Sequence, residues 1–161
     1  MDRACADALI AILHREGKIR KTGDRYALPD FTVTLTKRQR GIRDKLMGIY
    51  STAGIETPIT EHIMEGFPSN ERPEAKQVLE SLITSGDLIL LTPQICLYRK
   101  DYDRILDIAR THFETSDSLT LAQLRDMLNT SRKYAQAIIE YFDKIHITRK
   151  DGDIHYLDQG F

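Results

Sequence analysis

The sequence contains few of the residues and motifs that catalysis or metal binding requires. Its two cysteines, Cys5 and Cys96, lie far apart, and neither has a second Cys or a His at metal-ligand spacing. The five histidines form neither HxxxH nor HExxH, and the phosphate-loop, GxGxxG and GxSxG motifs are all missing. We therefore expect no catalytic residues, no metal site and no cofactor, and we interpret both cysteines as reduced thiols.

Long hydrophobic runs and a strong net charge are also missing. No stretch approaches the roughly 20 apolar residues that a membrane-spanning helix needs, and the start of the chain lacks the pattern of a secretory signal. Lys and Arg number 23 against 24 Asp and Glu, so the net charge of −1 indicates no polyanionic partner by itself. With 41% hydrophobic residues the chain can build a core, and we expect a cytoplasmic protein that does not bind membranes.

The informative feature is an internal repeat. Three segments share a pattern of a short apolar strand, a polar tip and a second short strand, and they span residues 17–28, 86–97 and 145–157. Amphipathic helical spacing precedes them, most clearly over 73–85 and 132–143. Gly-Asp or Pro-Gln at the tips is typical of tight turns.

This arrangement predicts an α+β fold, mainly α, built from tandem winged helices, in which a helix-turn-helix core carries a two-stranded wing. We divide the chain into the end of a truncated winged helix (1–30), a complete winged helix (31–100) and a second complete one (101–161). Residues 31–36 alternate and suggest a short strand or an extended connector. The alternative is a generic α+β domain whose hairpins resemble one another by chance.

A local basic patch lies inside the otherwise acidic last unit. Residues 101–161 hold 8 basic and 11 acidic side chains, yet 129–150 hold five basic and two acidic ones. Helical spacing over 132–143 predicts that Lys133 and Ala137 face outward, with small Ala137 allowing a nucleic acid to approach closely. Arg149 and Lys150 would project from the wing across the same groove.

The patch suggests a nucleic-acid site at the start of this helix. Lys and Arg side chains would hold phosphates, backbone N–H groups at Ser131 could meet an anion, and a base could stack on Tyr134. The alternative to a nucleic-acid site is that the charged side chains are only solvated. In that case Tyr134 and Tyr141 would cover the edge of the core. A second basic cluster at 37–43 is interpreted as solvated or as a contact between units, and Arg125 with Asp126 as a structural pair.

Three sequence segments resemble one known family. The runs LAQLRDMLNTSRKYA (121–135), EYFD (140–143) and TRKDGD (148–153) are similar to the last winged helix of the bacterial selenocysteine-specific elongation factors, SelB. That family delivers selenocysteinyl-tRNA at an in-frame UGA, and its C-terminal winged helices bind a hairpin in the messenger. The resemblance implies that the helix start and the wing contact RNA. At one position of the wing, this chain has His155 where the family often has Arg. When the family's contacts are carried over by position, the candidate residues are Ser131, Arg132, Lys133, Tyr134, Arg149, Lys150 and His155.

The resemblance also defines the expected partners. We expect a non-enzymatic fragment that binds the messenger hairpin as a monomer and reaches the ribosome through the full-length factor, with GTP bound only in a domain absent from this chain. Two alternatives remain open. One is a winged-helix regulator that reads duplex DNA in the major groove, and the other is a winged-helix scaffold for protein partners.

Overall fold

The computed structural model describes residues 10–14, 19–22, 25–27 and 35–161. Residues 10–14 are helical and lie inside the unit interpreted as the end of a truncated winged helix (1–30). Strand β1 (Arg20–Thr22) pairs antiparallel with β2 (Arg25–Ala27), which agrees with the first predicted hairpin. Most of the connector expected over 31–36 lies outside the described residues.

The second unit opens with three helices around a small core. They are α2 (Lys37–Ala53), α3 (Thr60–Glu65) and α4 (Arg72–Ser85). A capping box between Thr36 and Gln39 begins α2. Gly86 ends α4 with φ 85°, a left-handed conformation that glycine adopts without strain. The apolar faces of the three helices then close over Leu46 and Tyr50, which are fully buried.

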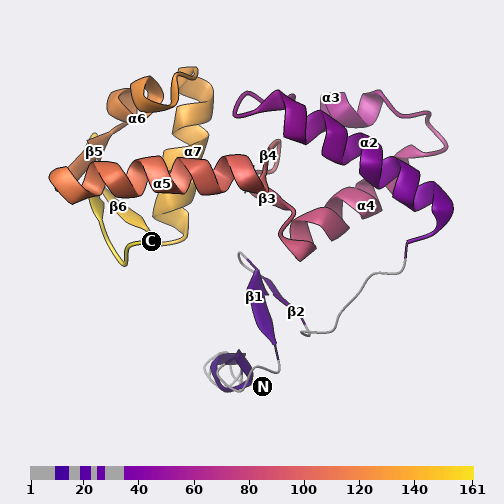
Figure 1. Cartoon of the computed structure of the whole chain (residues 1–161), viewed down its shortest axis with the longest axis horizontal. Helices are drawn as coiled ribbons and strands as arrows, with labels where there is room; N and C mark the ends of the chain where they lie inside the picture. The colour runs from indigo at the N-terminus through magenta and orange to yellow at the C-terminus, as the bar shows by residue number, and fades with distance from the viewer. Residues whose placement is uncertain (1–9, 15–18, 23–24, 28–34) are drawn as a thin grey trace.

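The hairpin of the second unit serves two cores. Strands β3 (Leu88–Thr92) and β4 (Ile95–Tyr98) pair antiparallel, and successive side chains point to opposite faces. Leu88 and Cys96 pack into the core of the second unit. The opposite face belongs to the core of the third unit and comprises Ile89, Leu91, Ile95 and Leu97. The hairpin accordingly lies between the two groups of helices in Figure 1.

The third unit follows β4 without a linker. Its elements are α5 (Arg99–Thr115), β5 (Ser118–Thr120), α6 (Leu121–Leu128), α7 (Arg132–Lys144), β6 (Thr148–Asp151) and β7 (Ile154–Leu157). The expected two-stranded wing is a three-stranded sheet of order β5-β7-β6, because Ser118–Thr120 also pairs with β7. A capping box between Thr120 and Gln123 begins α6.

The predicted fold class, a mainly helical α+β winged-helix architecture, is confirmed by this arrangement and by the structural comparison given below. Among the described residues, no helix combines the length and the apolar character needed to cross a bilayer.

One helical face was predicted wrongly. Ala137 was expected to be exposed, but it is only 5% exposed and belongs to the core that includes the β3–β4 hairpin. Tyr141 is buried beside it and meets the edge of the Tyr102 ring at 5.8 Å between centroids. Helical spacing correctly identified the face of α7 that packs inside its own unit. The face that contains Ala137 is buried as well, in the core that the β3–β4 hairpin shares. A nucleic acid therefore cannot approach α7 across Ala137.

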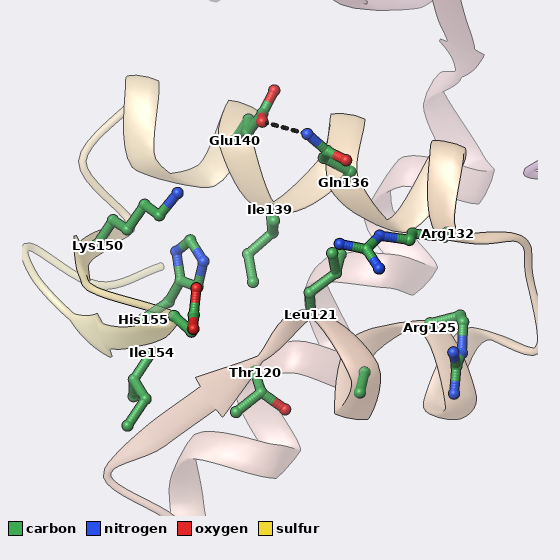
Figure 2. Close-up of a pocket in the computed structure, with 12 residues that line it drawn as sticks. Thr120, Leu121, Arg125, Arg132, Gln136, Ile139, Glu140, Lys150, Ile154 and His155 are labelled. Carbon is green, nitrogen blue, oxygen red and sulfur yellow. Dashed lines mark hydrogen bonds between the residues drawn. The ribbon is translucent and has the colours of Figure 1, made fainter.

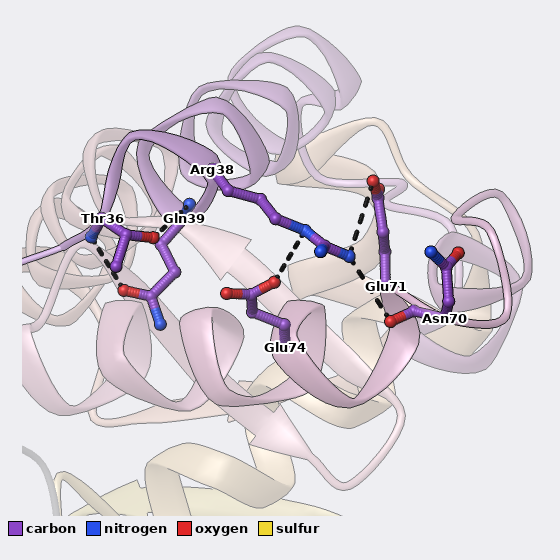
Figure 3. Close-up of polar contacts among 6 residues, drawn as sticks. All are labelled: Thr36, Arg38, Gln39, Asn70, Glu71 and Glu74. Carbon is purple, nitrogen blue, oxygen red and sulfur yellow. Dashed lines mark hydrogen bonds and ion pairs between the residues drawn. The ribbon is translucent and has the colours of Figure 1, made fainter.

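The basic cluster at the start of α2 is a contact within one unit. Arg38 Nε lies 2.9 Å from a carboxylate oxygen of Glu74, and Arg38 Nη2 lies 3.7 Å from Glu71 and 3.4 Å from the carbonyl oxygen of Asn70 (Figure 3). Arg38 thereby joins α2 to α4 within one unit. Its side chain is still 49% exposed, so the expectation of a solvated residue agrees with the structure, whereas a contact between units is not what Arg38 makes. Such a partly exposed network adds little to stability.

Candidate nucleic-acid interface

A groove of about 560 Å³ lies between the start of α6, one face of α7 and the wing. We call it the wing groove. Its lining consists of Thr120, Leu121, Ala122, Arg125, Arg132, Gln136, Ile139, Glu140, Lys150, Asp153, Ile154 and His155. Figure 2 shows Arg132 reaching in from α7 and Lys150 from the wing, on opposite sides of Ile139. The groove therefore combines an apolar floor with cationic side chains on two walls.

Local structure determines where Arg132 and Lys150 lie along the backbone and on which side of the groove. Arg132 is the first residue of α7, directly after the N-cap Ser131. Lys150 lies in β6 opposite His155 in β7, and cross-strand partners point to the same face of a sheet. The sequence prediction that the helix start and the wing flank one groove agrees with the positions of Arg132 and Lys150.

The candidate Lys and Arg side chains have no acidic partner within the described residues. In the described part of the chain, no carboxylate forms a salt bridge with Arg132, Lys133, Arg149 or Lys150. By contrast, Arg125 is bonded to Asp126 at 2.7 and 2.8 Å, as the sequence suggested. Side chains without a carboxylate partner can engage a phosphate without first breaking an ion pair.

Arg149 and Lys133 point away from the wing groove. Arg149 precedes Lys150 in the strand and so lies on the opposite face of the wing, where its guanidinium stands 5.4 Å from the centroid of Tyr156. Lys133 lies over the Tyr134 ring at 5.4 Å, on another side of α7. The predicted residues therefore form three surfaces around one helix start and one wing.

The start of α7 already contacts a carboxylate of the second unit. Ser131 makes no side-chain capping bond, and its backbone N–H donates to Glu56 Oε1 at 2.9 Å. Thr130 donates its hydroxyl to the same oxygen at 3.0 Å. The Tyr134 hydroxyl donates to the carbonyl oxygen of Thr57, and burial together with the nearby Glu56 charge raises the pKa of Tyr134. Tyr134 is therefore a protonated donor within the chain.

His155 lies beneath the wing groove rather than on its rim. It is 4% exposed, and its Nδ1 lies 2.9 Å from a carboxylate oxygen of Asp143. Asp143 also accepts a hydrogen bond of 2.6 Å from Thr148, which is fully buried. The Asp143 carboxylate thus joins α7 to both strands of the wing and fixes the imidazole that borders the groove.

Replacing Asp143 with alanine is expected to lower the free energy of unfolding by about 1–3 kcal/mol, because buried His155 and Thr148 would lose their shared partner. Urea denaturation followed by circular dichroism would measure the loss. Asp151→Ala, which removes an exposed carboxylate from the wing, is the control. Equal stability of the two variants would contradict a supporting role for Asp143.

Sequence reasoning missed the face of α7 that lines the groove. Arg132, Gln136 and Ile139 follow one another at i, i+4 and i+7, and Gln136 donates to Glu140 at 2.8 Å. This spacing was visible in the sequence. The predicted exposed stripe through Lys133 and Ala137 lies on a different side of α7.

Comparisons with known proteins agree with the resemblance drawn from residues 121–153. Residues 111–157 match the family model "Elongation factor SelB, winged helix". The selenocysteine-specific elongation factor of Desulfomicrobium baculatum is 28% identical over 145 residues, which cover 90% of this chain and 23% of that protein. The chain thus spans about a quarter of the length of this curated relative.

Two solved structures share the fold. One is the mRNA-binding domain of SelB from E. coli in complex with SECIS RNA, with a TM-score of 0.60 and 21% identity over 77% of this chain and 99% of that one. The other is a bacterial selenocysteine-specific elongation factor, EF-Sec, with a TM-score of 0.56 and 16% identity over 98% of this chain and 26% of that one. The chain therefore resembles the C-terminal winged-helix region of SelB in sequence and in fold.

Proposed function

We propose that this chain is the messenger-binding part of a selenocysteine-specific elongation factor and that its third unit binds the loop of an RNA hairpin. The observation that carries the proposal is the wing groove, where Arg132 and Lys150 lie on opposite sides of Ile139 and neither has a carboxylate partner in the described part of the chain. The groove lies within residues 111–157, the segment that matches the SelB winged-helix model. Phosphates would lie against the two cations, and the apolar floor at Ile139 would accept an unstacked base.

The remaining roles belong to the same proposal. The chain binds rather than catalyses and needs no cofactor of its own. It acts in the cytoplasm as a monomer, and the full-length factor brings it to the ribosome. Ser131, Lys133, Tyr134 and Arg149 would extend the RNA-binding surface beyond the groove, since each lies on the helix start or on the outer face of the wing.

Binding to RNA hairpins should exceed binding to matched duplex DNA by at least about tenfold, because an unpaired loop offers base faces that a duplex hides. Fluorescence anisotropy would be measured with labelled SECIS RNA of E. coli and with a pool of RNA hairpins that share one stem and have randomised loops. The competitors are a DNA duplex and an RNA duplex of the same length. Equal affinity for hairpin and duplexes, or no binding to either hairpin probe, would overturn the proposed function and favour a DNA regulator or a protein scaffold.

A further inference from the structure

A short segment of the second unit contacts the first turn of α7. Glu56 Oε1 accepts hydrogen bonds from the hydroxyl of Thr130 and from the backbone N–H of Ser131, at 3.0 and 2.9 Å. The next residue, Thr57, accepts a hydrogen bond from the Tyr134 hydroxyl through its carbonyl oxygen. We call these three hydrogen bonds the clasp. They connect the loop between α2 and α3 to residues more than seventy positions later in the chain.

The clasp supplies one bond of a capping box at the start of α7, because Glu56 accepts the hydrogen bond from the N-cap backbone N–H that the side chain at N3 usually accepts. An N-cap Ser normally accepts a hydrogen bond from the first turn and so fixes the position of the helix start. Ser131 makes no such bond, and the side chain bound to its backbone is Glu56. The position of the start of α7 is therefore set in part by the second unit.

The clasp is anchored firmly in the second unit. Thr57 is completely buried, and its hydroxyl donates to the carbonyl oxygen of Cys96 in β4 at 2.8 Å. Ile55, on the other side of Glu56, packs against the core of the third unit. Both neighbours of Glu56 are thus held, so the backbone at Glu56 is fixed next to the start of α7, while the Glu56 side chain itself is exposed.

The residues held by the clasp coincide with proposed RNA contacts. Ser131 and Tyr134 bond directly to it, and Arg132, which enters the wing groove, follows Ser131 in the chain. We propose that Glu56 is a positioning residue: it holds the first turn of α7 in the orientation that binds RNA, and so couples the second unit to a site it does not line. This inference rests on the proposed hairpin binding of the third unit.

Because Glu56 is negatively charged, the proposal can be tested by the direction in which RNA affinity changes when Glu56 is replaced. Its carboxylate carries the same charge as a phosphate and lies next to the proposed contacts, so electrostatics alone predict that removing it tightens RNA binding. If Glu56 positions the helix start, removing it weakens RNA binding instead. The loss of its hydrogen bonds to α7 then outweighs the relief of the repulsion between the carboxylate and phosphate across solvent.

The test compares Glu56→Ala with Glu56→Gln in the full chain, using the same hairpin probes. The alanine variant should bind about tenfold more weakly, since it removes two hydrogen bonds that fix the helix start. The glutamine variant should bind at least as well as the unmodified chain, because its side-chain oxygen still accepts both hydrogen bonds. The matched control is Glu61→Ala, which removes an exposed carboxylate from α3 and should leave affinity unchanged.

The outcomes separate the two proposals. If the unmodified chain binds no hairpin, the proposed function fails. If it binds and Glu56→Ala binds equally well or more tightly, the function stands and the positioning role is overturned. Loss of affinity in both Glu56 variants would also overturn it, because glutamine preserves the acceptor. Thermal unfolding of each variant shows whether the fold persists, and recovery of affinity by glutamine distinguishes positioning from a general loss of structure.

Discussion

Reversing the charges of Arg132 and Lys150 together, as Arg132→Glu with Lys150→Glu, is expected to weaken hairpin binding by roughly 100-fold or more. Each residue lines the wing groove, and neither has a carboxylate partner among the residues that the structure describes. Removing one charge-assisted hydrogen bond costs about 1.5–3 kcal/mol, and removing two corresponds to at least about 100-fold in affinity. Repulsion between the new carboxylates and the RNA adds to this effect. Anisotropy titrations at several salt concentrations measure it.

The fold should tolerate these substitutions. An acidic residue at the first position of α7 interacts favourably with the helix dipole, and Lys150 is an exposed strand residue. The single variants Arg132→Ala and Lys150→Ala should each reduce the slope of log affinity against log salt by about 0.7–0.9 for each phosphate that the variant no longer neutralises.

A control with the same change in charge tests whether position matters. Lys76 in α4 and Lys100 in α5 are exposed and do not line the groove. Lys76→Glu with Lys100→Glu should weaken binding far less than the groove pair. If both double variants weaken binding equally, only overall charge matters, and the wing groove is not the RNA site.

Local signals in the sequence predicted the helices, the hairpins and their order. The helical spacing of apolar residues and the turn residues at the hairpin tips act over a few residues, so a single sequence reveals them. The third strand of the wing was missed because Ser118–Thr120 is short and pairs with a strand far along the chain.

The surfaces between units could not be predicted in the same way. Ala137 and Tyr141 lie off the principal apolar stripe of α7, and nothing near them in the sequence shows that the β3–β4 hairpin covers them. The same limit applies to Glu56, whose partners lie 74 and 75 residues away. Contacts between distant segments depend on how the units pack, which hydrophobic periodicity does not encode.

The candidate site was predicted from charge and from the resemblance, and in the structure its residues lie on separate surfaces. Arg132 and Lys150 share the wing groove, whereas Arg149 lies on the other face of the wing by simple strand alternation. Strand alternation could have separated Arg149 from Lys150 at the outset. The burial of His155 against Asp143 depends on how α7 packs on the wing, so it could not be anticipated.

Truncating Leu97 to alanine is expected to lower the free energy of unfolding by about 2–5 kcal/mol, the usual range for removing a fully buried Leu side chain. Leu97 is completely buried, lies opposite Ile89 in the β3–β4 hairpin and packs into the core of the third unit. Urea denaturation followed by circular dichroism would measure the loss. Leu157→Ala, at a position that is 43% exposed, is the control and should change stability by less than about 0.5 kcal/mol.

The location of Leu97 makes the expected loss of stability informative about both units. Leu97 belongs to the second unit by sequence and to the third by packing, whereas Leu88 in the same hairpin is fully buried in the core of the second unit. If one hairpin supplies both cores, Leu97→Ala and Leu88→Ala should each shift a single unfolding transition shared by the two units. Two separate transitions, with each variant moving only one of them, would mean that the units unfold independently. The second unit would then give α7 no lasting support, because the clasp could open while the third unit stayed folded.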